Sequence, residues 1–167
     1  MSSRFLNSPT EPVVIGPALS VSACTLQEAK ALSIAFAHME PWSRYPFPAP
    51  TLEAYLAGQE LGAPRYAIYA QNRLAGAVGL RLNWLRGPYI QFLGVLPEFQ
   101  TIGIGGEILK KLEQDAREAG SRNLWVAASD FNEGAQRFYS RHGFAHVGVL
   151  DDLVRDGIAE VLLRKRL

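Results

Sequence analysis

The sequence has only one cysteine, Cys24, among its 167 residues. A single thiol cannot form an internal disulfide, so the fold depends on its apolar core, and such cysteine usage is typical of a reducing compartment. Nothing in the sequence around Cys24 favours a lowered thiol pKa. We therefore interpret Cys24 as a small buried side chain and not as a nucleophile.

An excess of either charge is also lacking, because 17 Lys and Arg residues face 16 Asp and Glu residues. No basic stripe is interleaved with aromatic residues, so neither a nucleic acid nor an anionic membrane is indicated as a partner. No apolar run approaches the length of a membrane span, and residues 1–12 lack the sustained apolar core of a signal peptide. We expect a cytoplasmic protein.

The length is that of one domain, which can bury a core without further support. We expect a flexible N-terminal segment over residues 1–12 and a single domain over residues 13–167. Thr25 and Glu28 form a plausible capping box at the start of a helix. Apolar periodicity and turn residues predict helices at 25–39, 52–60, about 104–119 and 133–142, and strands at 13–15, 66–70, 74–84, 89–96, 124–129, 144–150 and 158–164. This alternation predicts an α/β three-layer sandwich with a mixed sheet.

Residues 93–109 carry an apolar strand through a glycine-rich turn into an amphipathic helix. Gly103, Gly105 and Gly106 permit backbone angles closed to other residues and let a ligand approach the main chain. No capping side chain directly precedes Ile104, so the first N–H groups of the helix stay available to an anion. The spacing fits neither a dinucleotide fingerprint nor a P-loop. The alternative is a turn that serves only to reverse the chain.

Two motifs resemble those of the GNAT superfamily of acyl-CoA-dependent N-acyltransferases. The first is Gln100-x-x-Gly103-x-Gly105, and the second is Asn132-x-x-Ala135-x-x-Phe138-Tyr139-x-x-x-Gly143-Phe144. They follow one another in the family's order, separated by one helix and one strand. The resemblance extends from about Val13 to the end of the chain and implies a three-layer α/β/α sandwich whose central sheet is splayed.

The resemblance implies an N-acetyltransferase that moves an acetyl group from acetyl-CoA to a primary amine by direct transfer in a ternary complex. Acetyl-CoA is then the co-substrate, no metal is expected, and the acceptor amine is unidentified; a homodimer is left open. The implied cofactor-binding residues lie on the strand, the glycine turn and the second motif: Leu93, Gly94, Val95, Gln100, Thr101, Ile102, Gly103, Ile104, Gly105, Gly106, Asn132, Ala135, Phe138 and Tyr139.

Tyr139 is the implied catalytic residue, because the family places this tyrosine near the thioester sulfur. A phenol with an ordinary pKa is protonated at neutral pH and can donate a proton to the departing thiolate. The sequence alone equally allows Tyr139 as a core aromatic residue beside Phe138. Asn132 is likewise either a contact to the pantetheine arm or an N-cap, and both roles are compatible.

Residues 40–50 place four prolines and three aromatic residues in a stretch that can form neither a helix nor a central strand. In the resembling fold this region lies over the cleft, so Trp42, Tyr45 and Phe47 are expected to form part of the acceptor wall. Their rings favour an acceptor with an apolar or aromatic body. The alternative is a loop whose rings close the core.

The glycine turn departs from the family pattern at Thr101 and Ile102, where members often carry Arg or Lys. The pyrophosphate would then depend on main-chain donors and on more distant charges, for which Lys110, Arg137 and Arg141 are candidates.

A second departure is the missing glutamate in the central strand, where some family members have a general base. Gln91 stands in that strand and cannot accept a proton usefully, while Glu40, His38 and Asp130 are candidates elsewhere. Together the departures favour an alternative function, a non-catalytic CoA-binding or protein-interaction module that keeps the fold.

Overall fold

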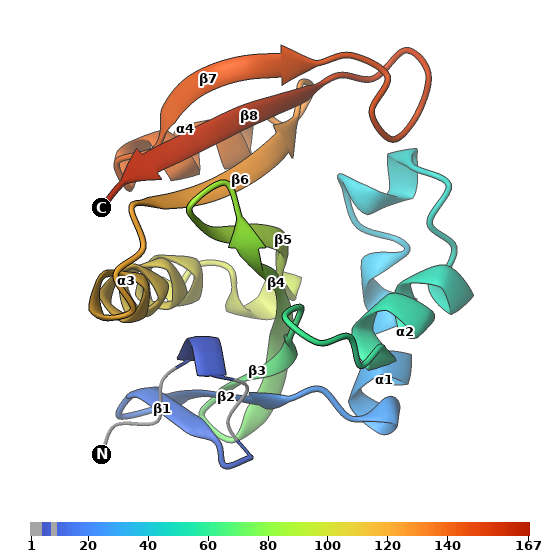
Figure 1. The fold of residues 1–167 in the computed structure, drawn as a ribbon. Helices are drawn as coiled ribbons and strands as arrows, with labels where there is room; N and C mark the ends of the chain where they lie inside the picture. Colours follow the sequence, from blue (N-terminus) through green and yellow to red (C-terminus); the bar gives the residue numbers. More distant parts are fainter. Residues whose placement is uncertain (1–4, 8–9) are drawn as a thin grey trace.

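The computed structural model describes residues 5–7 and 10–167, in which eight strands form one mixed sheet in the order β1-β2-β3-β4-β5-β6-β8-β7 (Figure 1). The strands are β1 (Val13–Gly16), β2 (Leu19–Ala23), β3 (Arg65–Ala70), β4 (Arg73–Trp84), β5 (Gly87–Val95), β6 (Asn123–Ser129), β7 (Ala145–Leu150) and β8 (Glu160–Arg166). The helices are α1 (Leu26–Phe36), α2 (Ala49–Ala57), α3 (Ile104–Glu118) and α4 (Glu133–Arg141), with short 3-10 helices η1 (Phe5–Asn7), η2 (Trp42–Arg44) and η3 (Pro97–Phe99).

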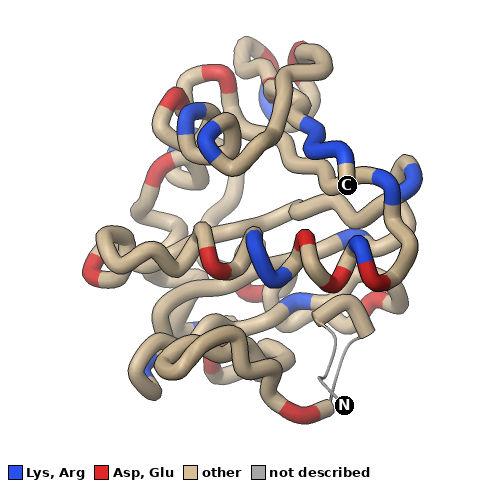
Figure 2. The backbone as a smooth tube through the Cα atoms, turned by 90° about the vertical axis from the view of Figure 1, so that its left-hand side faces the viewer, with Lys and Arg blue, Asp and Glu red and all other residues tan. Residues whose placement is uncertain are grey.

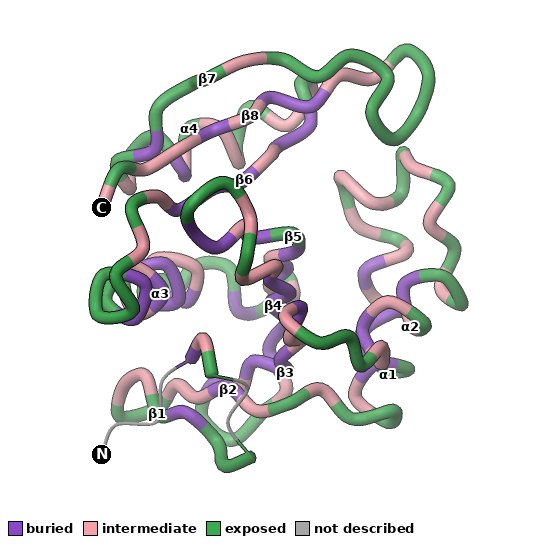
Figure 3. Tube along the Cα trace, viewed as in Figure 1, coloured by how far each residue is buried: buried purple, intermediate pink, exposed green. Residues whose placement is uncertain are grey.

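Helices cover both faces of this sheet, as the predicted three-layer α/β sandwich requires. In Figure 1, α1 and α2 lie on one side of β3 and β4, and α3 lies on the other. Two clusters of buried side chains fill the two interfaces: one includes Ile108 and Leu112 of α3, and the other includes Leu32 of α1 and Leu56 of α2. Buried positions accordingly concentrate where the helices face the strands, whereas β7 is largely exposed (Figure 3).

The sheet opens between its two halves. β5 and β6 are parallel neighbours, yet they pair only at Tyr89↔Trp125 and Ile90↔Val126. Beyond these pairs β5 continues against β4 as far as Val95, while β6 continues against β8 as far as Ser129. The β6-facing edge of β5 beyond Ile90 therefore has no strand partner among the described residues, and the predicted splay is confirmed.

The first described residues belong to the core. The Phe5 side chain is fully buried against Tyr66, with ring centroids 4.9 Å apart, and the Phe5 N–H donates to the carboxylate of Asp115 at 2.5 Å. The core thus extends beyond the expected domain start at residue 13. Residues 1–4 and 8–9 of the segment expected to be flexible lie outside the described residues.

Several element predictions were wrong in detail. Strand β2 was missed because it is only five residues long; its side chains alternate, but only two of them, Leu19 and Val21, are bulky and apolar. Helix α2 begins at Ala49 instead of residue 52, since Pro50 sits in the first helical turn, where its missing N–H costs nothing. The Thr25–Glu28 capping box is confirmed, and the first residue of α1, Leu26, is 74% exposed.

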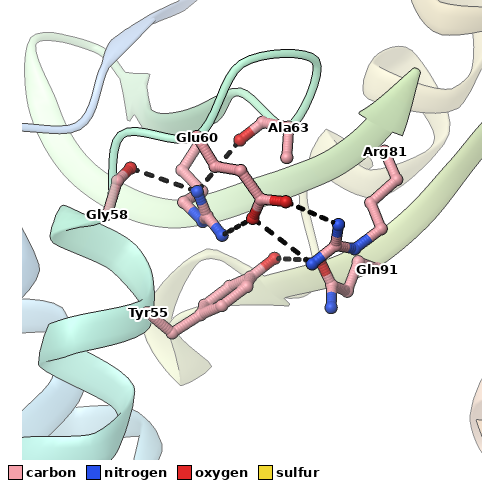
Figure 4. Close-up of polar contacts among 7 residues, drawn as sticks. Tyr55, Gly58, Glu60, Ala63, Arg81 and Gln91 are labelled. Atoms are coloured by element: carbon pink, nitrogen blue, oxygen red, sulfur yellow. Dashed lines mark hydrogen bonds and ion pairs between the residues drawn. The ribbon is translucent and has the colours of Figure 1, made fainter. Parts of the chain in front are cut away.

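A polar network fixes the connection between α2 and β3 against the centre of the sheet (Figure 4). Glu60 pairs with Arg81 at 2.9 Å and with Arg65 at 3.5 Å. Arg65 also donates to backbone carbonyls and lies over the ring of Tyr55, 4.6 Å from its centroid. The Tyr55 hydroxyl in turn donates to Gln91 of β5 at 3.3 Å. Gln91 is thereby part of a structural network.

Candidate functional site

A cleft lies at the opening between β5 and β6 and consists of two adjoining cavities. The glycine-side cavity, of about 500 Å³, lies between the end of β5, the turn into α3 and the start of α4; the Tyr45-side cavity, of about 430 Å³, lies between β5, β6, η2 and the loop before β8. Six residues line both cavities: Pro41, Trp42, Leu93, Asn132, Ala135 and Tyr139. The two cavities therefore adjoin along these residues.

The glycine turn closes one end of this cleft. Gly103 is the N-cap of α3 with φ of 80°, a left-handed conformation that favours glycine, and no side chain caps the helix. Its N-terminal N–H groups thus stay available, as the sequence predicted. Gly105 and Gly106 have an additional packing role, because an added Cβ would lie 2.9 Å from the Phe138 ring and 2.9 Å from Nε2 of His142, respectively.

Most of the predicted cofactor-binding residues meet at the glycine-side cavity. Its lining includes Leu93, Gly94, Val95, Gln100, Gly103, Gly105, Gly106, Asn132, Ala135, Phe138 and Tyr139. Thr101 lines a neighbouring cavity beside α3 and α4. The Ile104 side chain is buried in the core, and the Ile102 side chain is 58% exposed and lines none of the described cavities. Ile102 and Ile104 can therefore contact the cofactor only through main-chain atoms.

Tyr139 stands where the two cavities meet. Its ring packs against Phe138 and Phe144, with centroids 5.1 and 5.5 Å away, and the residue is 7% exposed. Burial raises the pKa of the Tyr139 phenol, and the nearby Tyr89 adds to the shift, so the hydroxyl stays protonated at neutral pH. The core-aromatic role and a role in the cleft are therefore compatible.

Two polar side chains fix the backbone around this junction. Asn132 is the N-cap of α4, and its Oδ1 accepts from the N–H of Ala135 at 3.1 Å. Gln100 donates through Nε2 to the carbonyl of Val95 at 3.0 Å, which joins the glycine turn to the end of β5.

The three aromatic residues expected in the acceptor wall all line the Tyr45-side cavity. Trp42 stacks on Phe92 at 4.6 Å between centroids, and Tyr45 stacks on Phe47 at 5.6 Å. Trp42 and Phe47 also pack against the core under α1 and α2. Closing the core and lining a cavity were posed as alternatives, yet this loop does both.

Glu160, which was not predicted from the sequence, is the first residue of β8 and lines the same cavity. Its side chain is buried, with the residue 8% exposed, and it accepts a hydrogen bond from the Tyr45 hydroxyl. The Tyr45 oxygen also lies 2.5 Å from Oγ of Ser129, and the one Ser129 hydroxyl proton can be donated to Tyr45 or to Glu160. The available signal was a single acidic residue within the apolar run Ile158-Ala-Glu-Val-Leu-Leu.

A family model described as acetyltransferase (GNAT) family matches residues 29–144, which include both motifs and most of the cleft lining, but not Glu160. The chain belongs to this GNAT family. A curated relative, streptothricin acetyltransferase A of Bacillus subtilis (strain 168), is 27% identical over 96 residues, which cover 58% of this chain and 55% of the relative. The chain spans about half the length of the curated relatives it matches.

Solved GNAT structures share the fold over nearly the whole chain. A Salmonella typhimurium acetyl transferase, described as modifying the N-terminal serine of the ribosomal protein L7/L12, matches with a TM-score of 0.78, 18% identity and coverage of 94% of this chain and 99% of that chain. The microcin C7 self-immunity acetyltransferase MccE, solved with acetyl-CoA and AMP, matches with a TM-score of 0.75, 17% identity and coverage of 96% and 98%.

The side chains considered as general bases from the sequence all have other partners, although Glu40 lines the glycine-side cavity. Glu40 pairs with Arg44 at 2.7 Å, and Nδ1 of His38 contacts the carbonyl of Ile34 at 2.9 Å. Asp130 accepts from the N–H of Ala159 at 3.4 Å. Glu160 is the one carboxylate on the lining of the Tyr45-side cavity.

The charges near the glycine turn can also be sorted. Of the three candidates, Arg137 pairs with Glu133 at 3.1 Å, whereas Lys110 and Arg141 line the cavity beside the turn. Charges of both signs alternate along α3, so this face offers no continuous basic stripe (Figure 2).

Burial raises the pKa of the Cys24 thiol to about 12, which agrees with a non-nucleophilic role.

Within the described residues, no group of three or more His, Cys, Asp and Glu side chains is arranged to hold a metal ion. None of the helices described is both long and apolar enough to cross a membrane.

Proposed function

We propose that this protein is an acetyl-CoA-dependent N-acetyltransferase that transfers the acetyl group directly to a primary amine in a ternary complex. The observation that carries the proposal is the pair of adjoining cavities, with an uncapped helix N-terminus at one end, a buried carboxylate at the other and Tyr139 on the lining of both. Acetyl-CoA as the co-substrate and the single Cys24 also agree with the cytoplasmic location expected from the sequence, which stays a prediction.

The chain offers a suitable place for each part of acetyl-CoA. The free edge of β5 beyond Ile90 can pair with the amide groups of the pantetheine arm, as an added strand would. The N-terminal N–H groups of α3 suit the pyrophosphate, with Lys110 and Arg141 supplying the positive charge that Thr101 and Ile102 do not. An ideal Cβ on Gly103 would meet no atom within 4 Å, so the main chain is open to a ligand there.

The chemistry follows from this placement. The neutral amine nitrogen attacks the thioester carbonyl carbon, and main-chain N–H groups of Leu93 to Val95 stabilise the negative charge that develops on its oxygen. The C–S bond then breaks, and the Tyr139 hydroxyl donates a proton to the departing thiolate. The amine nitrogen loses one proton as the amide forms, and this proton restores the Tyr139 phenol. Because the phenol is buried in the cleft lining and its pKa is raised, it is protonated when the thiolate leaves.

Thiol release tests the proposal. Purified protein would be incubated with acetyl-CoA and a panel of primary amines, and free CoA thiol would be measured with a thiol reagent. We expect thiol release that depends on the amine and yields the acetylated amine by mass spectrometry. Binding of acetyl-CoA with no amine-dependent release across the panel would support the non-catalytic CoA-binding module instead.

A further inference from the structure

The Glu160 carboxylate lies in a cavity without a positively charged partner. The lining of the Tyr45-side cavity contains no Lys, Arg or His among the described residues. Glu160 forms no ion pair there, and its contacts are the Tyr45 hydroxyl and the neighbouring Ser129. A buried carboxylate is costly without a countercharge. The cavity is therefore built to receive a cation.

The groups that face Glu160 add to this preference. Asp130, which follows β6, and Tyr89 of β5 interact with it electrostatically, and Tyr45 reaches it from the loop after η2. Burial raises the pKa of Glu160, the negative charge of Asp130 raises it further, and the hydrogen bonds from Tyr45 and Ser129 oppose the shift. Two arginines lie just outside the lining: Arg44 stacks over the Phe131 ring at 4.3 Å and pairs with Glu40 at 2.7 Å, and Arg155 donates to the Arg44 carbonyl. Neither lines the cavity, so the charge that an acceptor meets on its wall is that of Glu160.

Around the carboxylate the cavity is apolar and aromatic. Tyr45 lies between the rings of Phe47 and Phe131, with centroids 5.6 and 6.1 Å away. Leu153 and Val154, from the loop before β8, form another wall. The volume of about 430 Å³ suits a small organic molecule, or the end of a larger one. Ring faces stabilise both apolar groups and nearby cations.

We propose that Glu160 binds the ammonium group of the acceptor and removes its proton, and that the acceptor is a primary amine attached to an apolar or aromatic body that lies on Tyr45, Phe47 and Trp42. This inference rests on the proposed function and names its acceptor class. One N–H proton passes from the ammonium ion to the carboxylate, which leaves the neutral amine to attack the thioester. As the amide forms, the amine's second proton restores the phenol of Tyr139, which has given its own proton to the thiolate, and Glu160 returns the first proton to solvent.

Calorimetry on the CoA-bound protein tests the site independently of turnover. The probes are 2-phenylethylamine and 2-phenylethanol, which share the ring and differ in charge. We expect the amine to bind at least about tenfold more tightly than the alcohol, since a charge-assisted hydrogen bond is lost with the ammonium group. Glu160→Gln should abolish this preference, because its neutral side chain keeps the shape of Glu160. Glu118→Gln, at an exposed position at the end of α3, is the matched control.

Equal binding of the two probes, binding of neither, or an unchanged preference in Glu160→Gln would overturn the proposal. Kinetics separate this failure from failure of the proposed function. In Glu160→Gln, kcat/KM for the amine should fall about 100-fold while CoA binding persists. A parent protein that releases thiol, with a Glu160→Gln variant equally active, contradicts the role of Glu160 and leaves acetyl transfer standing. Absence of thiol release with every amine contradicts acetyl transfer, whereas the calorimetry still decides the ammonium site.

Discussion

At the scale of single residues, Tyr139 combines a packed ring with a place on the lining of both cavities. Tyr139→Phe keeps the ring contacts to Phe138 and Phe144 and removes only the proton donor. We expect kcat to fall about 10² to 10⁴-fold, as is typical of general acid catalysis, with acetyl-CoA affinity nearly unchanged. Single-turnover kinetics with the best amine would measure the effect. An unchanged rate of the chemical step would leave Tyr139 as a core residue only.

When its carboxyl is ionised, Glu160 should destabilise the folded protein. Because burial raises its pKa in the folded state, the unfolded chain ionises first as the pH rises, and stability is lost until the pH exceeds the folded-state pKa. Glu160→Gln should therefore melt at a higher temperature than the parent at about pH 8, and this advantage should disappear near pH 4, where unfolded glutamate is about half protonated. Differential scanning calorimetry at both pH values measures it. An advantage that does not change with pH would contradict the raised pKa.

Site residues within a sequence motif were predicted, whereas a site residue outside the motifs was not. Tyr139 and Asn132 were identified because they stand in a motif with fixed spacing. Glu160 was missed because its role depends on three segments distant in the chain that bring Tyr45, Ser129 and Glu160 together. Local spacing carries no information on such a contact. Ile104 shows the converse, since it falls within a motif but its side chain packs in the core.

At the scale of elements, the turn between η3 and α3 should set cofactor affinity through charge. Ile102 is exposed and lies in that turn, so its substitution changes charge without changing the core. Ile102→Arg should tighten acetyl-CoA binding and Ile102→Glu should weaken it, each by about threefold to tenfold at low salt. Calorimetric titration would compare the two variants with the neutral Ile102→Gln. Equal affinities in all three would place the pyrophosphate elsewhere.

Element boundaries show what sequence patterns can and cannot predict. The long helix after the glycine turn and strands β4 and β5 were predicted well, because their periodicity extends over many residues. Strand β2 was missed because it depends on pairing with β1 and β3 and has only two bulky apolar residues, Leu19 and Val21. The β5–β6 splay came from the family resemblance, since no local pattern predicts where two parallel strands diverge.

At the scale of the whole molecule, acetyl-CoA should join the two halves of the sheet, which pair at only two positions between β5 and β6. A ligand at 100 times its Kd stabilises the fold by about 2.7 kcal/mol, so the melting temperature should rise by about 5 to 10 °C. Hydrogen exchange should slow on both sides of the cleft, at Leu93 to Val95 and at Ala127 to Ser129. Protection confined to one side would show that the ligand does not bridge the halves.

The most direct test of acetyl transfer at this cleft is a crystal structure of the protein with CoA. We expect the pantetheine arm along the free edge of β5, the pyrophosphate at the N-terminus of α3, and the CoA sulfur within hydrogen-bonding distance of the Tyr139 hydroxyl. The thiol should point toward Glu160 and the Tyr45-side cavity. CoA bound away from the glycine turn, or with its sulfur directed away from Tyr139, would contradict the account.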